Sequence, residues 1–238
     1  MKPKAILFDS GNTLCYPKTG NWFLPPKYYE IYKKYQINHN SIGFWINFAK
    51  ARNYLDKNHL IKDESEEKEQ FKEFYKMLLA KRKYQQIRDE AAEILSTDNV
   101  YNDEKFIFYD DVKPTIEKLS KDYTLGIVSD TWPSLERVYR NYGIYDYFQI
   151  FIMSSIYGST KSNKELFIIA LEKLNINPNE IAFVDDSYSN LRIADEIGLI
   201  PIKITRNDNN NRRRKSIKMK NHLCKEIKSI RELENIEW

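Results

Sequence analysis

Short apolar runs alternate with amphipathic helical stretches along this chain of 238 residues, but only at its start and in its second half. The runs are rich in Ile, Val, Leu or Phe, and each has the length and composition of a buried strand. The expected strands are Ala5–Phe8, Thr124–Ser129, Phe148–Ser154, Ile181–Val184 and Ile200–Thr205. The helical patterns between them cover Lys113–Ser120, Ser134–Tyr142, Lys164–Leu174 and Asn190–Gly198.

This alternation predicts an α/β fold with a doubly wound, Rossmann-like parallel sheet whose two faces are covered by helices. Crossovers between parallel strands are right-handed, so the carboxyl ends of all the strands lie along one edge of the sheet. Ligands of such sheets bind at that edge, and we therefore expect the functional residues just after the strands.

The stretch between Cys15 and Asp110 breaks the alternation and has helical patterns almost throughout. Ser41 can cap one of these helices, and Ser65 can start another. Many aromatic residues recur there at helical spacings, and we expect most of them to pack within a small bundle. They are Tyr28, Tyr32, Tyr35, Phe44, Trp45, Phe48, Phe71, Phe74 and Tyr75.

The break in pattern predicts two domains. Residues 1–14 and 111–238 would form the α/β core, and residues 15–110 would form an all-helical cap inserted into it. Because the insertion follows the carboxyl end of the first strand, we expect the cap to act as a lid over the active edge.

The composition excludes several classes of protein. No apolar run approaches the ~20 residues that a membrane-spanning helix needs, so we expect no membrane partner. The first residues lead directly into a strand and do not resemble a secretory signal. Only Cys15 and Cys224 are present, far apart and outside any metal-ligand spacing, so we expect no disulfides and a cytoplasmic location.

The net charge of +4 is concentrated near the end of the chain. Between Arg206 and Lys228 there are nine Lys and Arg residues and two acidic residues, Asp208 and Glu226. Such a run is typical either of a nucleic-acid-binding tail or of a solvated surface loop. No aromatic residue lies within 206–220 to stack on bases, so we expect a surface loop and no nucleic-acid partner.

Polar residues follow four of the expected strands at the point where each strand ends. A single such residue is often only a turn or a helix cap, and a lone Lys can be a structural ion-pair partner. Together, however, they would place carboxylates, hydroxyls and an ammonium group at one edge of the sheet. In chain order they are Asp9–Thr13, Ser129-Asp130, Lys161 and Asp185-Asp186.

These residues carry a resemblance to a known family. Phe8-Asp9-Ser10-Gly11-Asn12-Thr13-Leu14 resembles the first motif of the haloacid dehalogenase superfamily, a nucleophilic Asp followed four residues later by Thr. Ser129, Lys161 and Asp186 are similar to the second, third and fourth motif residues, in the expected order. The resemblance covers the whole expected core, and the helical insertion matches the position of the family's helical cap.

The resemblance implies a hydrolase that needs Mg²⁺ and forms an aspartyl-phosphate on Asp9. Asp9, the backbone carbonyl of Gly11 and Asp186 are the implied Mg²⁺ ligands, with Asp185 acting through water. A cation at this place would cancel the repulsion between a carboxylate nucleophile and a phosphate dianion.

The remaining motif residues have implied roles in binding the phosphoryl group. Lys161 would neutralise charge on Asp9 and on the group being transferred. Ser129, Thr13 and the backbone N–H groups near Ser10 would hold the other phosphoryl oxygens. The implied partner is a small phosphorylated metabolite, and the sequence does not indicate an oligomeric state.

The sequence departs from the family pattern at Gly11. Phosphatases of the family carry a second Asp there as general acid and base, and loss of such a group typically costs ~10²–10⁴ in rate. Asp130, Asp185, Tyr188 or a cap side chain could replace it. Alternatively, the substrate could be an acyl phosphate or aryl ester, whose leaving group needs no proton.

Two further functions are compatible with Gly11. Halide also leaves without a proton, so the chain could be a 2-haloacid dehalogenase, or it could bind phosphate compounds without turnover. The Asp185-Asp186 pair favours a metal-dependent phosphatase, because the family's dehalogenases use no metal and have a less acidic fourth motif. The segment between Leu14 and Lys50 also contains no Arg that could hold a halide.

Overall fold

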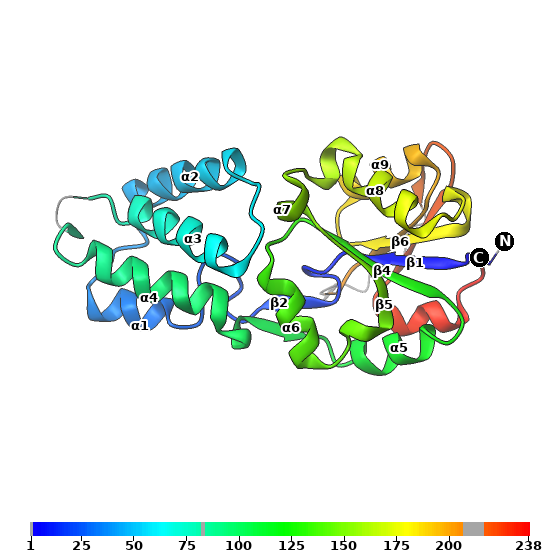
Figure 1. Cartoon of the computed structure of the whole chain (residues 1–238), viewed down its shortest axis with the longest axis horizontal. Coiled ribbons are helices and arrows are strands. Elements are labelled where there is room, and N and C mark those ends of the chain that lie inside the picture. Colours follow the sequence, from blue (N-terminus) through cyan, green and yellow to red (C-terminus); the bar gives the residue numbers. More distant parts are fainter. Residues whose placement is uncertain (1, 82–83, 207–216) are drawn as a thin grey trace. The chain divides into compact units, whose positions relative to one another are not determined.

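The computed structural model describes residues 2–81, 84–206 and 217–238, and the chain divides into two compact units (Figure 1). The α/β unit comprises Met1–Tyr16, Phe108–Thr131 and Leu135–Trp238. The helical unit comprises Pro17–Ile107 and Trp132–Ser134.

Within the described residues, the α/β unit contains a seven-stranded sheet with the order β5-β4-β1-β6-β7-β9-β8. All neighbouring strands pair in parallel except β8, which is antiparallel to β9. The α/β fold class and the parallel sheet predicted from the sequence are therefore confirmed. The strands are β1 (Ala5–Phe8), β4 (Thr124–Ser129), β5 (Phe148–Met153), β6 (Ile181–Asp185), β7 (Ile200–Ile204), β8 (Ile217–Lys218) and β9 (Leu223–Ile227).

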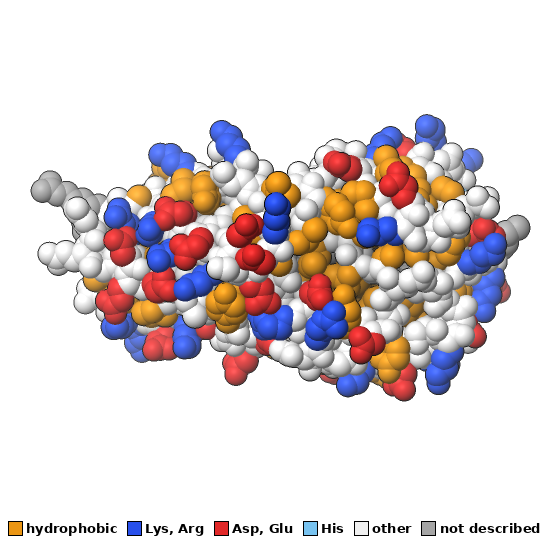
Figure 2. Space-filling view, in the orientation of Figure 1, with side chains coloured by type: hydrophobic (Ala, Val, Ile, Leu, Met, Phe, Trp, Pro, Cys, Tyr) orange, Lys and Arg blue, Asp and Glu red, His pale blue; other side chains and the backbone are white. Residues whose placement is uncertain are grey.

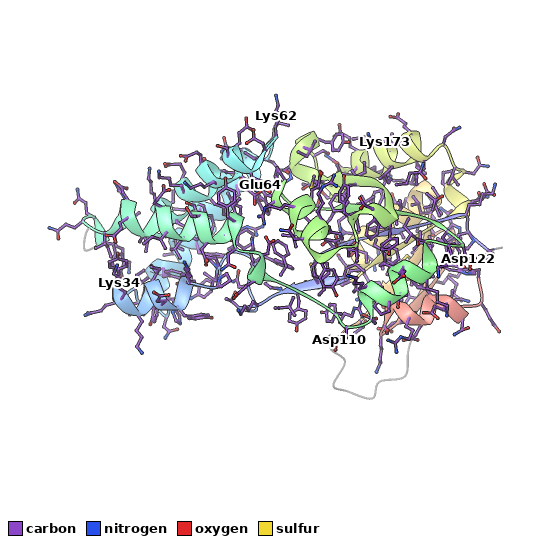
Figure 3. The ribbon with its side chains drawn as sticks, turned by 60° about the horizontal axis from the view of Figure 1, so that its bottom comes forward. Lys34, Lys62, Glu64, Asp110, Asp122 and Lys173 are labelled. Atoms are coloured by element: carbon purple, nitrogen blue, oxygen red, sulfur yellow. The ribbon has the colours of Figure 1, made fainter. Side chains whose placement is uncertain are left out.

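Helices cover both faces of this sheet. Figure 1 shows α8 (Glu165–Leu174) and α9 (Tyr188–Ile197) on one face and α5 (Val112–Leu119) with the 3₁₀ helix Ile230–Asn235 on the other. Asp110 and Asp122 flank the two ends of α5 (Figure 3). Side chains of α8 and α9 form a buried apolar cluster with those of β1, β4, β5 and β6. The two remaining helices of this region are α6 (Ser134–Tyr142) and α7 (Ser154–Tyr157).

Several details of the sheet differ from the prediction, and β6 and β7 end one residue later and one residue earlier than expected. β5 ends at Met153 because Ser154 already begins α7. Strands β8 and β9 were not predicted, since the described part of β8 is exposed and β9 carries two charged residues in a run of five. A short polar strand at a sheet edge lacks the apolar run from which the other strands were recognised.

The helical unit contains α1 (Tyr28–Lys34), α2 (Ile42–Lys57), α3 (Glu64–Leu78) and α4 (Arg88–Tyr101). Ser41 caps α2, as expected, by accepting a hydrogen bond from the Phe44 amide at 3.2 Å. The expected start of α3 at Ser65 was wrong, because Asp63 is the cap and accepts from the Glu66 amide at 2.9 Å. An Asp in extended conformation is among the strongest helix caps.

Aromatic side chains form the core of the helical unit. Five of the predicted packing residues are buried, namely Tyr28, Phe44, Phe71, Phe74 and Tyr75. Trp45, in contrast, is half exposed. Figure 2 shows acidic and basic side chains interspersed over the surface of this unit, where Lys68 and Lys72 both pair with Glu93.

The expected helical insertion is not helical at its ends. β2 (Cys15–Pro17) and β3 (Phe106–Phe108) form a two-stranded sheet there. None of the helices in the described ranges is long and apolar enough to cross a membrane.

Candidate active site

The loop after β1 is a tight turn that presents Asp9 at the carboxyl edge of the sheet. The Asp9 amide donates to the Val184 carbonyl of β6 at 2.9 Å, which fixes the start of the loop. The Ser10 carbonyl then accepts the amides of Thr13, Leu14 and Cys15 at 3.3, 2.8 and 3.1 Å. The turn also needs a left-handed backbone, which Asn12 supplies with φ at 57°. Asn tolerates this conformation better than most residues.

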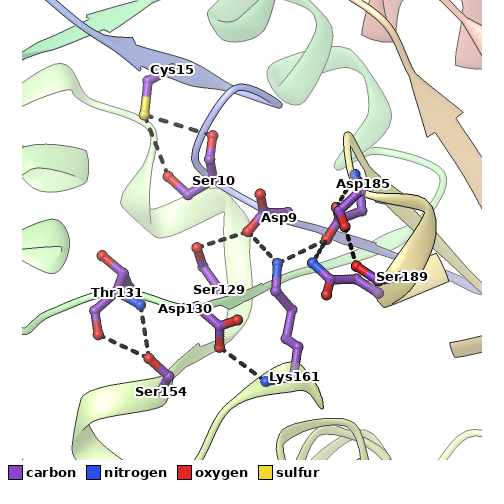
Figure 4. Close-up of polar contacts among 12 residues, drawn as sticks. Asp9, Ser10, Cys15, Ser129, Asp130, Thr131, Ser154, Lys161, Asp185 and Ser189 are labelled. Atoms are coloured by element: carbon purple, nitrogen blue, oxygen red, sulfur yellow. Dashed lines mark hydrogen bonds and ion pairs between the residues drawn. The ribbon is translucent and has the colours of Figure 1, made fainter. Parts of the chain in front are cut away.

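Two side chains hold the Asp9 carboxylate (Figure 4). Ser129, the last residue of β4, donates its hydroxyl to Asp9 Oδ1 at 2.9 Å. Lys161 Nζ lies 2.6 Å from the same oxygen and 2.8 Å from Asp185 Oδ2. The backbone amide of Lys161 is itself fixed by Asp130 Oδ1 at 3.0 Å. Residues separated by more than 100 positions in the sequence thus share one hydrogen-bond network.

Asp185 is completely buried at the end of β6, and both of its oxygens accept hydrogen bonds. Oδ1 accepts from the Ser187 amide at 2.6 Å, and Oδ2 accepts from Asn190 Nδ2 at 3.0 Å in addition to Lys161. The carboxylate is therefore held in one orientation by its own loop and by the first turn of α9.

The electrostatics of the site favour a bound cation. Burial raises the pKa of the Asp9 carboxyl to about 7, and Asp185 and Asp186 add to the effect while Lys161 opposes it. Burial, followed by the charge of Asp185, also raises the pKa of Asp186. Burial opposes the charged form of Lys161, but Asp9 and Asp185 outweigh it and raise the pKa of the ammonium group. Lys161 is thus a permanent cation among carboxylates that repel one another.

A divalent metal ion fits this arrangement. Asp9, Asp185 and Asp186 each offer a carboxylate oxygen, and the three oxygens lie within 4.8 Å of one another. Carboxylate oxygens are the protein ligands that Mg²⁺ prefers. A shared cation would also offset the repulsion among the carboxylates, which adds to the effect of burial on the pKa of Asp9.

Two other predicted site residues, Thr13 and Gly11, lie in the loop after β1. Thr13 is completely buried, and its Oγ1 has no hydrogen-bond partner within the described part of the chain. Buried polar groups are normally paired, so Thr13 Oγ1 is an exception beside this site. Gly11 lies in the same loop, where it forms a β-bridge with Cys15.

Three residues of the α/β unit could replace the Asp that is missing at position 11, namely Asp185, Asp130 and Tyr188. Asp185 already accepts hydrogen bonds from three donors. Asp130 is exposed and uses Oδ1 to accept the Lys161 amide. Burial raises the pKa of Tyr188, which is only partly exposed at the start of α9.

One residue near this site, Tyr139 of α6, was not predicted from the sequence. Its hydroxyl donates to Ser10 Oγ at 2.8 Å, in the residue next to Asp9. The expected position of Arg206 in an exposed basic loop was wrong, because its side chain is only 6% exposed and pairs with Asp111. Most of the run expected to be a surface loop, residues 207–216, lies outside the described residues.

Comparison with known proteins places these motifs in a family. The family model for haloacid dehalogenase-like hydrolases matches residues 3–198. Over 116 residues the chain is 30% identical to a glyceraldehyde 3-phosphate phosphatase of Methanopyrus kandleri. That alignment covers 44% of this chain and 48% of the relative, so it spans about half of the curated protein.

Solved structures show the same fold over nearly the whole chain. A phosphatase of this superfamily from Thermococcus onnurineus has a TM-score of 0.63 at 24% identity, with 99% of this chain and 97% of that one covered. A 2-haloacid dehalogenase from Pseudomonas syringae has a TM-score of 0.64 at 17% identity and the same coverage. The family match extends over most of the chain and agrees with the position of the four motifs. The protein is therefore a hydrolase of the haloacid dehalogenase-like family.

Proposed function

We propose that the protein is a Mg²⁺-dependent phosphatase of a small phosphorylated metabolite, with Asp9 as the nucleophile. The observation that carries this proposal is the group of three carboxylates, Asp9, Asp185 and Asp186, beside the buried Lys161. The proposed metal ligands are Asp9, Asp186 and the Gly11 carbonyl, with Asp185 acting through water. The similarity to a phosphatase of a phosphorylated sugar supports the substrate class.

In the proposed mechanism, one oxygen of Asp9 attacks phosphorus and the bond to the leaving-group oxygen breaks. Lys161 and Ser129 both bind Oδ1, so they orient the carboxylate and leave Oδ2 available for the attack. A bound Mg²⁺ would neutralise the phosphate and the nucleophile. The Thr13 hydroxyl, which has no hydrogen-bond partner among the described residues, would bind a phosphoryl oxygen. Water then hydrolyses the aspartyl-phosphate and releases inorganic phosphate.

Gly11 narrows the proposed substrates. With no carboxylate at this position, the leaving group of the first step departs unprotonated or takes its proton from solvent or from another side chain. Within the α/β unit, Asp130 is our candidate for the side chain that protonates the leaving group, because it is exposed to solvent. We propose that residues 15–110 form the cap and that the protein acts in the cytoplasm, where its two buried cysteines, which form no disulfide, would stay reduced.

The test compares wild type with Asp9→Asn on p-nitrophenyl phosphate and acetyl phosphate, with Mg²⁺ and with excess chelator. We expect turnover only for wild type with Mg²⁺, because an amide is a poor nucleophile and a weak metal ligand. Asp122→Asn is the matched control, since Asp122 is exposed at the end of α5 (Figure 3). Equal hydrolysis by Asp9→Asn would refute the role of Asp9.

The dehalogenase alternative makes a different prediction. A halide leaves without protonation, which the Gly at position 11 permits. Metal-independent release of chloride from 2-chloropropionate, with no phosphate ester hydrolysed, would replace the phosphatase proposal. Binding of phosphate compounds without any turnover would instead indicate a non-catalytic protein.

A further inference from the structure

Two cations at the end of β7 bind backbone carbonyls of the two loops that carry the carboxylates. Lys203 Nζ donates to the Asp186 carbonyl at 2.7 Å and to the Ile204 carbonyl at 2.8 Å. Arg206 donates from Nε and Nη2 to the Thr13 carbonyl at 2.9 and 2.7 Å. Both cations lie beyond residue 198, where the family match ends.

Arg206 is locked in place on its other side. Nη1 lies 2.8 and 2.7 Å from the two oxygens of Asp111, and the guanidinium carbon is 4.1 Å from the centre of the Tyr109 ring. Asp111 also accepts the Ile230 amide at 2.9 Å and the Ser229 hydroxyl. A planar guanidinium bound at several points loses little further freedom, so it is a rigid anchor for the Thr13 carbonyl.

We propose that Lys203 and Arg206 are positioning residues that hold the Asp186 loop and the Asp9 loop at the separation a divalent cation needs. This inference rests on the metal site of the proposed function. Three carboxylates within 4.8 Å of one another repel, and the repulsion acts to separate the loops that carry them. The two cations counter it through the backbone, so they leave the carboxylate oxygens available to the metal.

The direction in which the Kd for Mg²⁺ changes when Lys203 is replaced separates a positioning role from a simple effect of charge. If Lys203 acted only through its charge, its removal would make the site more negative and Mg²⁺ would bind more tightly. If Lys203 acts by holding the Asp186 carbonyl, its removal loosens a ligand loop and Mg²⁺ binds more weakly. A purely structural role would lower stability and leave the affinity of the folded protein unchanged.

The experiment is calorimetric titration of the full-length protein with Mg²⁺. The test variants are Lys203→Met and the double variant Arg206→Met with Asp111→Asn, in which no buried charge loses its partner. Asp111→Asn alone is the reference for the double variant, because it keeps the donors to the Thr13 carbonyl but removes the counterion of Arg206. The controls are Lys225→Met, which removes one charge from neighbouring β9, and Lys164→Met, which removes an exposed charge paired with Glu196. Lys225 instead donates to the Glu237 carbonyl.

We expect the Kd for Mg²⁺ to rise at least about tenfold in both test variants, as for other outer partners of metal ligands, and to stay within about twofold in the controls. Unchanged or tighter binding by folded Lys203→Met would overturn the inference, and this variant decides the matter if the double variant does not fold. Failure of wild type to bind Mg²⁺ would overturn the proposed metal site itself. If wild type and both test variants bound Mg²⁺ with the same Kd, only the positioning roles would be overturned.

Discussion

Replacing Lys161 by Met tests the electrostatic centre of the site. The Lys161 side chain is 3% exposed and lies between Asp9, 8% exposed, and Asp185, 0% exposed. Met fills most of the volume but removes the ammonium group, so two buried carboxylates would lose their shared partner. Removing one member of a buried ion pair costs about 3–5 kcal/mol, because the remaining charge stays desolvated.

For a chain of this size, a loss of 1 kcal/mol lowers Tm by about 2–4 °C. The expected decrease for Lys161→Met is therefore about 6–20 °C by thermal unfolding without Mg²⁺. The variant should also gain more from Mg²⁺ than wild type does, because the metal no longer competes with the ammonium group for Asp9 and Asp185. Stabilisation by a ligand rises with the logarithm of its concentration over Kd, so a Mg²⁺ series measures this difference directly.

Lys164→Met is the matched control, since Lys164 is 46% exposed and pairs with Glu196 at the surface. Such pairs contribute about 0–1 kcal/mol. If Lys161→Met were as stable as the control, the buried ion pairs would not be what holds Asp9 and Asp185 together. A smaller gain from Mg²⁺ in Lys161→Met than in wild type would refute the shared-site reasoning.

Further expectations concern leaving groups and pH. Gly11→Asp should speed hydrolysis of alkyl phosphates by up to ~10²–10⁴ while changing p-nitrophenyl phosphate little, because only the alkoxide needs a proton. Gly11 is not among the residues with a left-handed backbone, so its backbone conformation is one that Asp can adopt. Equal acceleration of both substrates would contradict this reasoning. In the helical unit, burial raises the pKa of Glu67 to about 7, from 4.5 in the unfolded chain. Its contribution to stability is complete below pH 4.5 and lost as the pH rises through 7, by on the order of 3 kcal/mol. Urea unfolding at pH 5.5 and 8 should show a larger loss for wild type than for Glu67→Gln, which keeps the pH dependence of Asp9, and parallel pH profiles would exclude the contribution of Glu67.

The candidate site could be predicted because each strand of a parallel sheet is recognised from a short run of residues, although the strands that meet at one edge are far apart in the sequence. The runs before Asp9 and Asp185 are apolar enough to be recognised as buried strands, and parallel pairing then brings their ends together. That logic placed Asp9, Ser129, Lys161 and Asp185 at one edge, where the structure also has them.

Other features could not be predicted because they depend on which partner a residue meets. Arg206 begins a run of basic residues, and composition cannot distinguish the one that reaches a buried carboxylate. Tyr139 lies within a correctly predicted helix, but helical periodicity does not identify the hydroxyl that meets Ser10. Whether Asp63 or Ser65 caps α3 likewise depends on backbone angles that the sequence leaves open.

The location of Arg206 also means that the segment matched by the family model is shorter than the segment that the fold of the α/β unit needs. A chain shortened at Gly198 would keep every motif of the family match. It would nevertheless lose β7, which pairs with β6. The backbone N–H and C=O groups on that side of β6 would then lose their partners, and β6 would become an exposed edge strand. Asp111 would remain in the interior with a charge and no counterion. Exposed sheet edges pair with other chains, so such a fragment would be expected to aggregate even though its catalytic signature is complete.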